Sequence, residues 1–168
     1  MTPGLEDPVD GEARRQALAE RIQRTKPQNF KSLGVSLGYR YEDSPVIVPD
    51  GTPPTPYETS RYAPTARPGH RAPHFWLPDG TALFDHFGQG FTLLMLKETD
   101  TSAIQQAACS RTVPLTLVRR PEPELRDLYE ANLVLVRPDQ HAAWRSDALP
   151  ADPGYLLDTM RGCGRRSR

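Results

Sequence analysis

The residues suited to redox or metal chemistry are few, and their spacing does not match a known site. The chain of 168 residues has two cysteines, Cys109 and Cys163, which lie far apart in the sequence. Disulfide exchange and zinc binding typically use two cysteines separated by two residues. We therefore expect a buried thiol in a helix at Cys109 and a thiol near a mobile tail at Cys163. No disulfide between them is expected in a reducing compartment.

Histidine and glycine patterns favour structural over catalytic roles. The four histidines are His70, His74, His86 and His141. The first two lie in a proline-broken loop, so their four-residue spacing does not place them on one helical face, and no set of carboxylates or thiols completes a metal shell. Gly88-Gln-Gly90 precedes a predicted strand instead of joining a strand to a helix, which indicates a turn and not a phosphate loop. No serine or cysteine lies in a nucleophile elbow. We predict no bound metal and no catalytic residue.

Two polar segments contain the residue types that often anchor interfaces, namely arginine, histidine and tryptophan. One segment runs from residue 67 to 77 and the other from residue 137 to 145. The candidate interface residues in them are Arg67, His70, Arg71, His74, Trp76, Arg137, Asp139, His141 and Trp144. The alternative, which the pattern alone favours, is that these side chains hold turns and satisfy one another's buried polar groups.

Alternating strands and helices in the second half of the chain must position these segments. The apolar runs 91–96, 114–118 and 133–136 predict strands, and a turn at 137–140 predicts a fourth strand at 141–145. Helices are predicted at 101–110 after Asp100, at 122–131, and from Asp152-Pro153 to Gly162. The first two strands should be parallel and the last hairpin antiparallel. This α/β pattern predicts a thioredoxin-like mixed four-stranded sheet with flanking helices.

The first half of the chain predicts a helix followed by a long arm. Residues 1–9 should be disordered, and Asp10 can cap a helix that reaches about Thr25 and carries a narrow apolar stripe. Such a helix is marginal alone and needs a partner surface. Leu33, Val35 and Leu37 alternate with small or polar residues, which is typical of extended structure, and the proline-flanked run 46–48 predicts an isolated or edge strand. We divide the chain into 1–36 (lead-in and helix), 37–80 (proline-rich connector arm), 81–163 (thioredoxin-like domain) and 164–168 (basic tail).

Charge and hydropathy exclude several classes of partner. The formal net charge is zero, so no basic field would attract nucleic acid. No apolar run reaches the length of a membrane span, and no signal peptide is visible at the acidic N-terminus. We expect a cytoplasmic protein with neither nucleic acid nor membrane as a partner.

Three motifs resemble those of one enzyme family. RPGHRAPHFWLPDGTALFDHFGQGFTLL (67–94) and LVLVRPDQHAAWR (133–145) are similar to stretches in the C-terminal domain of FAD-dependent aromatic-ring hydroxylases, the phenol hydroxylase-like flavoprotein monooxygenases. LGYRYEDSPVIVPDG (37–51) resembles the connector into that domain, and the helix before it resembles the tail of the flavin domain. In that family reduced nicotinamide delivers hydride to FAD, and a flavin hydroperoxide hydroxylates the ring. The sequence contains no strand–GxGxxG–helix unit, so the resemblance implies that FAD and NAD(P)H bind elsewhere and that this chain is not catalytic alone.

Two features argue against thiol chemistry despite the thioredoxin-like pattern. Redox thioredoxins place C-x-x-C between the first strand and its helix, and here residues 97–102 contain no cysteine. No proline stands immediately before the third predicted strand.

Three hypotheses about function follow. In the first, the chain is a structural and interaction part of a split or truncated hydroxylase that pairs with a separate FAD-binding chain and, in some members of the family, contributes to a homodimer. In the second, it is a stand-alone module that binds a small ligand or a protein without catalysis. In the third, it is a gene remnant without function.

Overall fold

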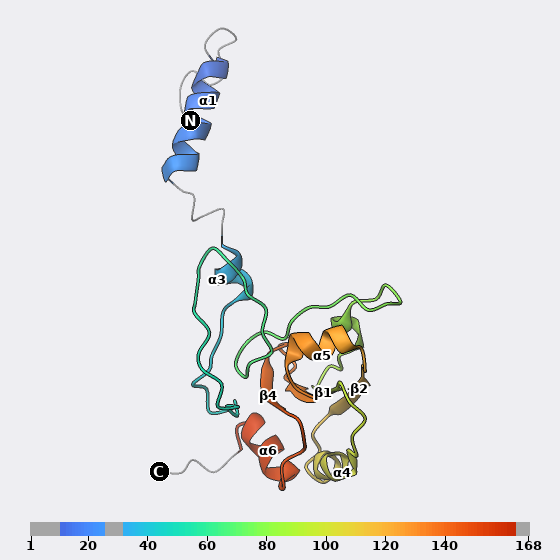
Figure 1. Cartoon of the computed structure of the whole chain (residues 1–168). Coiled ribbons are helices and arrows are strands. Elements are labelled where there is room, and N and C mark those ends of the chain that lie inside the picture. Colours follow the sequence, from blue (N-terminus) through green and yellow to red (C-terminus); the bar gives the residue numbers. More distant parts are fainter. Residues whose placement is uncertain (1–10, 26–31, 164–168) are drawn as a thin grey trace.

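The computed structural model describes residues 11–25 and 32–163, as Figure 1 shows. The predictions for the disordered lead-in, the cap at Asp10 and the basic tail at 164–168 lie outside the described residues. The first element is α1 (Gly11–Thr25), which confirms the predicted N-terminal helix. A short helix, α3 (Leu33–Leu37), follows it, and a long arm then leads to the sheet domain.

A mixed four-stranded sheet forms the centre of the domain. Its strands are β1 (Phe91–Met95), β2 (Leu115–Arg119), β3 (Leu133–Val136) and β4 (Ala142–Ser146). They lie in the order β2-β1-β3-β4, with β1 and β2 parallel, β3 antiparallel to β1, and β4 antiparallel to β3. The parallel first pair and the antiparallel final hairpin confirm the predicted thioredoxin-like fold.

Helices cover both faces of this sheet (Figure 1). Helices α4 (Ser102–Ser110) and α6 (Pro153–Met160) pack together on one face, while α5 (Pro123–Tyr129) and the 3₁₀ helix η1 (Leu83–His86) pack on the other. Successive strand residues serve the two faces in turn: Leu93 and Met95 lie in the core under α4 and α6, and Leu94 lies in the core under α5. Because both faces are covered, buried positions follow one another along a strand instead of alternating with exposed ones, as in β3, where all four residues are buried.

The helix ends follow the predicted signals. Asp100 accepts a hydrogen bond from the backbone N–H of Ser102 at 2.9 Å, and Asp152 accepts one from that of Tyr155 at 2.9 Å. Gly162, with φ of +79°, ends α6 in the left-handed conformation that glycine tolerates best. These local signals fix where α4 and α6 begin and where α6 stops.

The proline-rich arm lies along the outer edge of β4. The backbone N–H of Val48 donates to the carbonyl of Ala143, that of Ala142 donates to the carbonyl of His70, and that of Ala72 donates to the carbonyl of Gln140, at 2.8–2.9 Å. Apolar arm residues also enter the two cores: Ile47 packs in one, and Ala66 and Ala72 pack in the other. The arm therefore covers a sheet edge that would otherwise expose unpaired backbone groups.

Three local predictions were wrong. Residues 33–37 form a helical turn, α3, with a hydrogen bond from the N–H of Gly38 to the carbonyl of Gly34 at 3.0 Å; five residues are too few to separate a strand from a helix by alternation. Residues 46–48 form no regular strand: the N–H of Ile47 donates to the carbonyl of Ser44 in a local turn, and the backbone bond from Val48 to Ala143 described above is their contact with β4. Cys109 is exposed, because it follows the buried Ala108 by about 100° around α4.

Candidate functional site

The junction between β1 and α4 is where a redox thioredoxin would carry its cysteines. Here residues 97–101 include no cysteine. Cys109 lies at the opposite end of α4, and both cysteines are free and exposed. Within the described ranges 11–25 and 32–163, no group of three or more histidines, cysteines and carboxylates could hold a metal ion. The structure therefore brings together no metal-ligand set in these ranges and no dithiol at this junction.

The first group of predicted interface residues surrounds a carboxylate of the arm. Glu42 accepts a hydrogen bond from the guanidinium of Arg67, and its Oε1 lies 2.7 Å from Nε2 of His70. Arg67 also donates to the carbonyl of Thr52 at 3.0 Å. The His70 side chain is buried, and this burial lowers its pKa against the opposing effect of the Glu42 carboxylate. These contacts tie the arm to itself beside β4.

The second group lies at the turn between β3 and β4. Asp139 accepts a hydrogen bond from the hydroxyl of Tyr41 at 2.7 Å, and the Nη1 of Arg137 donates to the carbonyl of Met160 at 2.9 Å. His141 is buried, with its ring centroid 4.8 Å from that of Tyr39 and 4.7 Å from that of Tyr41. Burial, and then the hydrogen bond with Asp139, raise the pKa of Tyr41. This turn is thus fastened to the arm and to the end of α6.

The third group lies on the surface near η1. His74 meets Trp76 edge-on, with ring centroids 5.0 Å apart, and meets Phe84 at 5.5 Å. The guanidinium of Arg71 lies 5.4 Å over the Phe84 ring. Trp76 is 67% exposed, so its ring is accessible to solvent. Trp144 belongs to none of the three groups, because it is 7% exposed and packs in the core under α4 and α6.

Sequence reasoning missed two buried contacts that hold the arm and the domain together. Arg145 of β4, whose side chain is 6% exposed, donates from Nε to Asp50 at 2.5 Å and from Nη1 to the carbonyl of Tyr129 at 3.1 Å. The hydroxyl of Tyr129 in turn donates to the carbonyl of Pro73 at 2.7 Å, and burial raises its pKa. An arginine that follows three buried residues of β4 was the available signal for the first contact.

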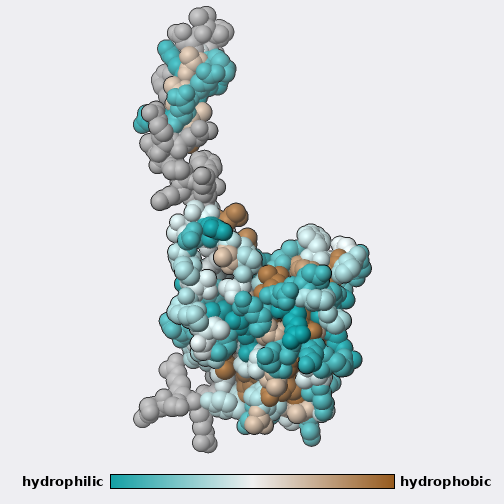
Figure 2. Space-filling view, viewed as in Figure 1, coloured by the Kyte–Doolittle hydropathy of each residue, from teal (hydrophilic) through white to brown (hydrophobic). Residues whose placement is uncertain are grey.

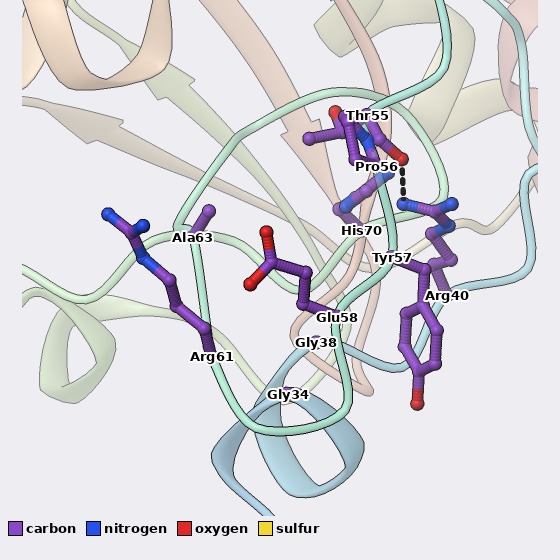
Figure 3. A pocket seen from close by; sticks show the side chains of 10 residues that line it. All are labelled: Gly34, Gly38, Arg40, Thr55, Pro56, Tyr57, Glu58, Arg61, Ala63 and His70. Carbon is purple, nitrogen blue, oxygen red and sulfur yellow. Dashed lines mark hydrogen bonds between the residues drawn. The ribbon is translucent and has the colours of Figure 1, made fainter.

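A pocket of about 190 Å³ lies between α3 and the arm, as Figure 3 shows. Arg40 donates from Nη1 to the carbonyl of Thr55 at 2.6 Å, and its guanidinium lies 5.7 Å from the centroid of the Tyr57 ring. In the figure the carboxylate of Glu58 points across the space enclosed by the arm, while the guanidinium of Arg61 points outward. The pocket is below the roughly 300–1,000 Å³ of typical small-molecule sites.

The pocket between α3 and the arm does not fit the dinucleotide FAD. The pocket is small, and none of the strand–helix junctions in the described part of the chain carries the glycine-rich turn that receives a pyrophosphate at a helix N-terminus. Gly88 and Gly90 instead allow the turn before β1 to pass close to β2, because a Cβ at Gly88 would lie 1.9 Å from Oγ1 of Thr116.

No helix of the described residues is long and apolar enough to span a bilayer.

The sequence of this chain is similar to parts of known flavin-dependent monooxygenases and hydroxylases. A family model described as "Aromatic-ring hydroxylase, C-terminal" matches residues 65–162. The FAD-dependent monooxygenase apdD of Emericella nidulans is 36% identical over 71% of this chain and 20% of its own length. Aklavinone 12-hydroxylase RdmE of Streptomyces purpurascens is 32% identical over 85% of this chain and 30% of its own length.

Solved structures agree with these matches. The rebeccamycin biosynthetic enzyme RebC, in a structure with reduced flavin, is 42% identical, with a TM-score of 0.74 over 98% of this chain and 31% of the RebC chain. The flavin-dependent monooxygenase PieE, solved with FAD and substrate, is 32% identical with a TM-score of 0.61 and is covered over 30% of its length. The chain thus spans between a fifth and a third of the length of these relatives.

Proposed function

Because this chain belongs to the family of aromatic-ring hydroxylase C-terminal domains, we propose that it is the structural and interaction part of an FAD-dependent aromatic hydroxylase. In this proposal FAD, NAD(P)H and the aromatic substrate bind to the part of the enzyme that precedes this domain. That preceding part is a separate chain or belongs to the same one. The C-terminal domain supplies a rigid surface on which the flavin-binding part packs, and it performs no chemical step by itself.

The observation that carries the proposal is how the polar residues are used. Of the nine residues singled out by sequence, Arg67, His70, Arg137, Asp139 and His141 make hydrogen bonds that fasten the arm or the β3–β4 turn within the domain. Side chains held by such hydrogen bonds stabilise the fold and do not act as free acids, bases or nucleophiles. Two relatives named FAD-dependent monooxygenases match this chain over about a fifth to a quarter of their length. These matches support a chemical step carried out by the rest of such an enzyme and a structural role for this domain.

A second candidate function is a stand-alone ligand-binding module, and the pocket between α3 and the arm favours it. Both an arginine and a carboxylate line this pocket. Its charged side chains and small volume fit a small polar ligand better than an aromatic substrate. We rank it below the first proposal, which we call the assembly function. A stand-alone module would have no role toward the remaining two thirds or more of the relatives' length.

Co-production with a flavin-binding part tests the proposal. The part of RebC that precedes the region matched here would be produced alone, and together with this chain carrying an affinity tag. We expect the two chains to purify together, with more FAD retained by the RebC part than when it is produced alone. If the RebC part elutes apart from this chain and retains the same amount of FAD in both cases, the assembly function is wrong.

A further inference from the structure

We propose that the outer edge of β2 is a pairing surface for a second copy of this chain. Residues 115–119 form this edge, which we name the β2 edge. Two β2 strands would pair antiparallel, so that the two four-stranded sheets join into one. This self-pairing is separate from the assembly function, because it needs no flavin-binding part.

The sheet has two edges, and they are treated differently. Strand β4 ends the sheet on one side, where the arm bonds to its backbone through Val48 and His70. Strand β2 ends the sheet on the other side. In the described ranges 11–25 and 32–163, no backbone group outside β1 bonds to residues 115–119. The β2 edge is therefore uncovered, and an uncovered edge is a template for a further strand.

The hydrogen bonds at the two ends of β2 show which of its backbone groups point outward. The carbonyl of Pro114 accepts from the N–H of Phe91 at 2.9 Å, and the N–H of Arg120 donates to the carbonyl of Met95 at 2.8 Å. In a parallel pair every second residue of a strand bonds to the neighbouring strand, so the even-numbered residues of β2 face β1. The N–H and carbonyl groups of the odd-numbered residues therefore point away from the sheet.

The side chains of the β2 edge are also suited to pairing. The odd-numbered residues are Leu115, Leu117 and Arg119, and both leucines are half-buried against the core under α4 and α6. Charged side chains along an edge strand normally prevent pairing, but the only charged residue of β2 is Arg119 at its end. Helix α4, which packs in the same core, contains no charged residue. Figure 2 shows hydrophobic atoms exposed at the lower end of the domain, where α4 and α6 lie in Figure 1.

The position of Arg119 favours an antiparallel second copy. In a parallel pair of β2 strands in register, the two Arg119 side chains would lie side by side, and like charges in such positions destabilise a sheet. In an antiparallel pair with Leu117 on the two-fold axis, Arg119 lies opposite Leu115 of the second copy instead. The β-branched Thr116 and Val118 then lie opposite each other, which is a favourable cross-strand pair. A two-fold contact of this kind is complete with two copies.

A proline substitution tests the β2 edge. Arg119→Pro removes an N–H that points outward, and proline is tolerated on an edge strand where the missing N–H would face solvent. Arg119→Ala is the matched control, because it removes the same side chain and keeps the N–H. The monomer–dimer equilibrium of each chain would be measured by sedimentation over a dilution series. We expect the unaltered chain and Arg119→Ala to dimerise with a dissociation constant of about 100 µM or tighter. Arg119→Pro should weaken dimerisation about tenfold or more, because the two-fold axis doubles the loss of one hydrogen bond.

Amide hydrogen exchange of the unaltered chain gives a second reading that needs no variant. In a dilute sample the outward amides of Leu117 and Arg119 should exchange faster than those of Thr116 and Val118, which bond to β1. In a concentrated sample, where dimers form, the exchange of Leu117 and Arg119 should slow down. Exchange of these two amides that is the same at both concentrations would contradict pairing at the β2 edge.

Each outcome either supports the self-pairing or overturns it. An unaltered chain that remains monomeric at about 1 mM overturns it. A dimer that Arg119→Pro and Arg119→Ala form equally well uses another surface, and the β2 edge is then the wrong one. If Arg119→Pro unfolds in urea much more easily than Arg119→Ala, the exchange rates decide, since they come from the unaltered chain. Association with the preceding part of RebC is measured separately, so the assembly function stands or fails independently of these results.

Discussion

Removal of the charge of Asp50 gives the sharpest test of how the arm is held on the sheet. Its carboxylate accepts a hydrogen bond from Nε of Arg145 at 2.5 Å, and from the backbone N–H and hydroxyl of Thr52 at 3.0 and 2.5 Å. The side chains of Asp50 and Arg145 are 11% and 6% exposed. Water therefore replaces few of these contacts when one partner is lost.

The expected cost of Asp50→Asn can be worked from these contacts. Loss of one partner of a buried ion pair typically costs about 3–5 kcal/mol. Arg145 would keep the carbonyl of Tyr129 and the carboxylate of Glu130, both at 3.1 Å, so the cost should be lower. One charged hydrogen bond contributes about 1.5–3 kcal/mol. We predict that Asp50→Asn lowers the free energy of unfolding by about 2 kcal/mol, which is a shift of roughly 1 M in the urea midpoint.

The dependence on pH gives a second reading of the same contact. Burial raises the pKa of Asp50, but the hydrogen bonds from Thr52 and Arg145 outweigh it, so the pKa in the folded chain is lowered. A carboxyl group of this kind contributes stability that is complete above its unfolded pKa of about 3.9 and is lost as the pH falls further. The difference in stability between the unaltered chain and Asp50→Asn should therefore be full at pH 7 and shrink below about pH 4.

The chain contains a matched control for this prediction. Asp79-Gly80-Thr81 repeats the turn of Asp50-Gly51-Thr52, with hydrogen bonds from Thr81 to Asp79 at 2.9 and 2.6 Å. No arginine of the described ranges donates a hydrogen bond to Asp79. Asp79→Asn should therefore reduce stability much less than Asp50→Asn, as measured by urea unfolding of both. Equal losses in the two variants, or a loss at Asp50 that does not change with pH, would refute the reasoning.

Three further predictions concern buried and exposed groups. Tyr129→Phe removes the buried hydrogen bond to the carbonyl of Pro73 and should lower the free energy of unfolding by about 1–2 kcal/mol in urea; an unchanged midpoint would contradict this. Burial lowers the pKa of His70 in the folded chain, so its contribution to stability is present above an unfolded pKa of about 6.5 and is lost as the pH falls. His70→Gln should therefore show a weaker fall in stability between about pH 7 and pH 5, measured by urea unfolding, and a fall as steep as in the unaltered chain would count against it. Cys109 and Cys163 are exposed, so a thiol reagent should titrate both in the folded protein without denaturant; slow reaction of either would be inconsistent with the structure.

Local patterns in the sequence were enough to predict the sheet domain. The largely apolar run of β1, the Asp100 carboxylate that accepts from the first N–H of α4, and the Asp152-Pro153 start of α6 each indicate one element without reference to the rest of the chain. The strand and helix order then leaves one compact arrangement with a parallel pair and an antiparallel hairpin. Short α3 was missed because five residues do not carry a period.

The contacts of the polar residues could not be predicted, because they depend on where the arm lies. Tyr41 and Asp139 are 98 positions apart in the chain, and Asp50 and Arg145 are 95 apart. No local rule connects such residues, and an arm without regular structure leaves its register on β4 open. The same limit applies to the interface. Arginine, histidine and tryptophan in two segments suggested a contact surface, whereas Arg67, His70, Arg137 and His141 form hydrogen bonds within the domain and Trp144 is buried.

The association of this chain with a flavin-binding part tests the central claim most directly. The measurement is the dissociation constant of the unaltered chain and the preceding part of RebC, obtained from the co-produced pair by sedimentation across a dilution series. The account predicts a specific complex with a dissociation constant of about 1 µM or tighter, typical of an interface of ordinary size. Two chains that sediment separately at about 100 µM, beyond the range of such interfaces, would contradict it.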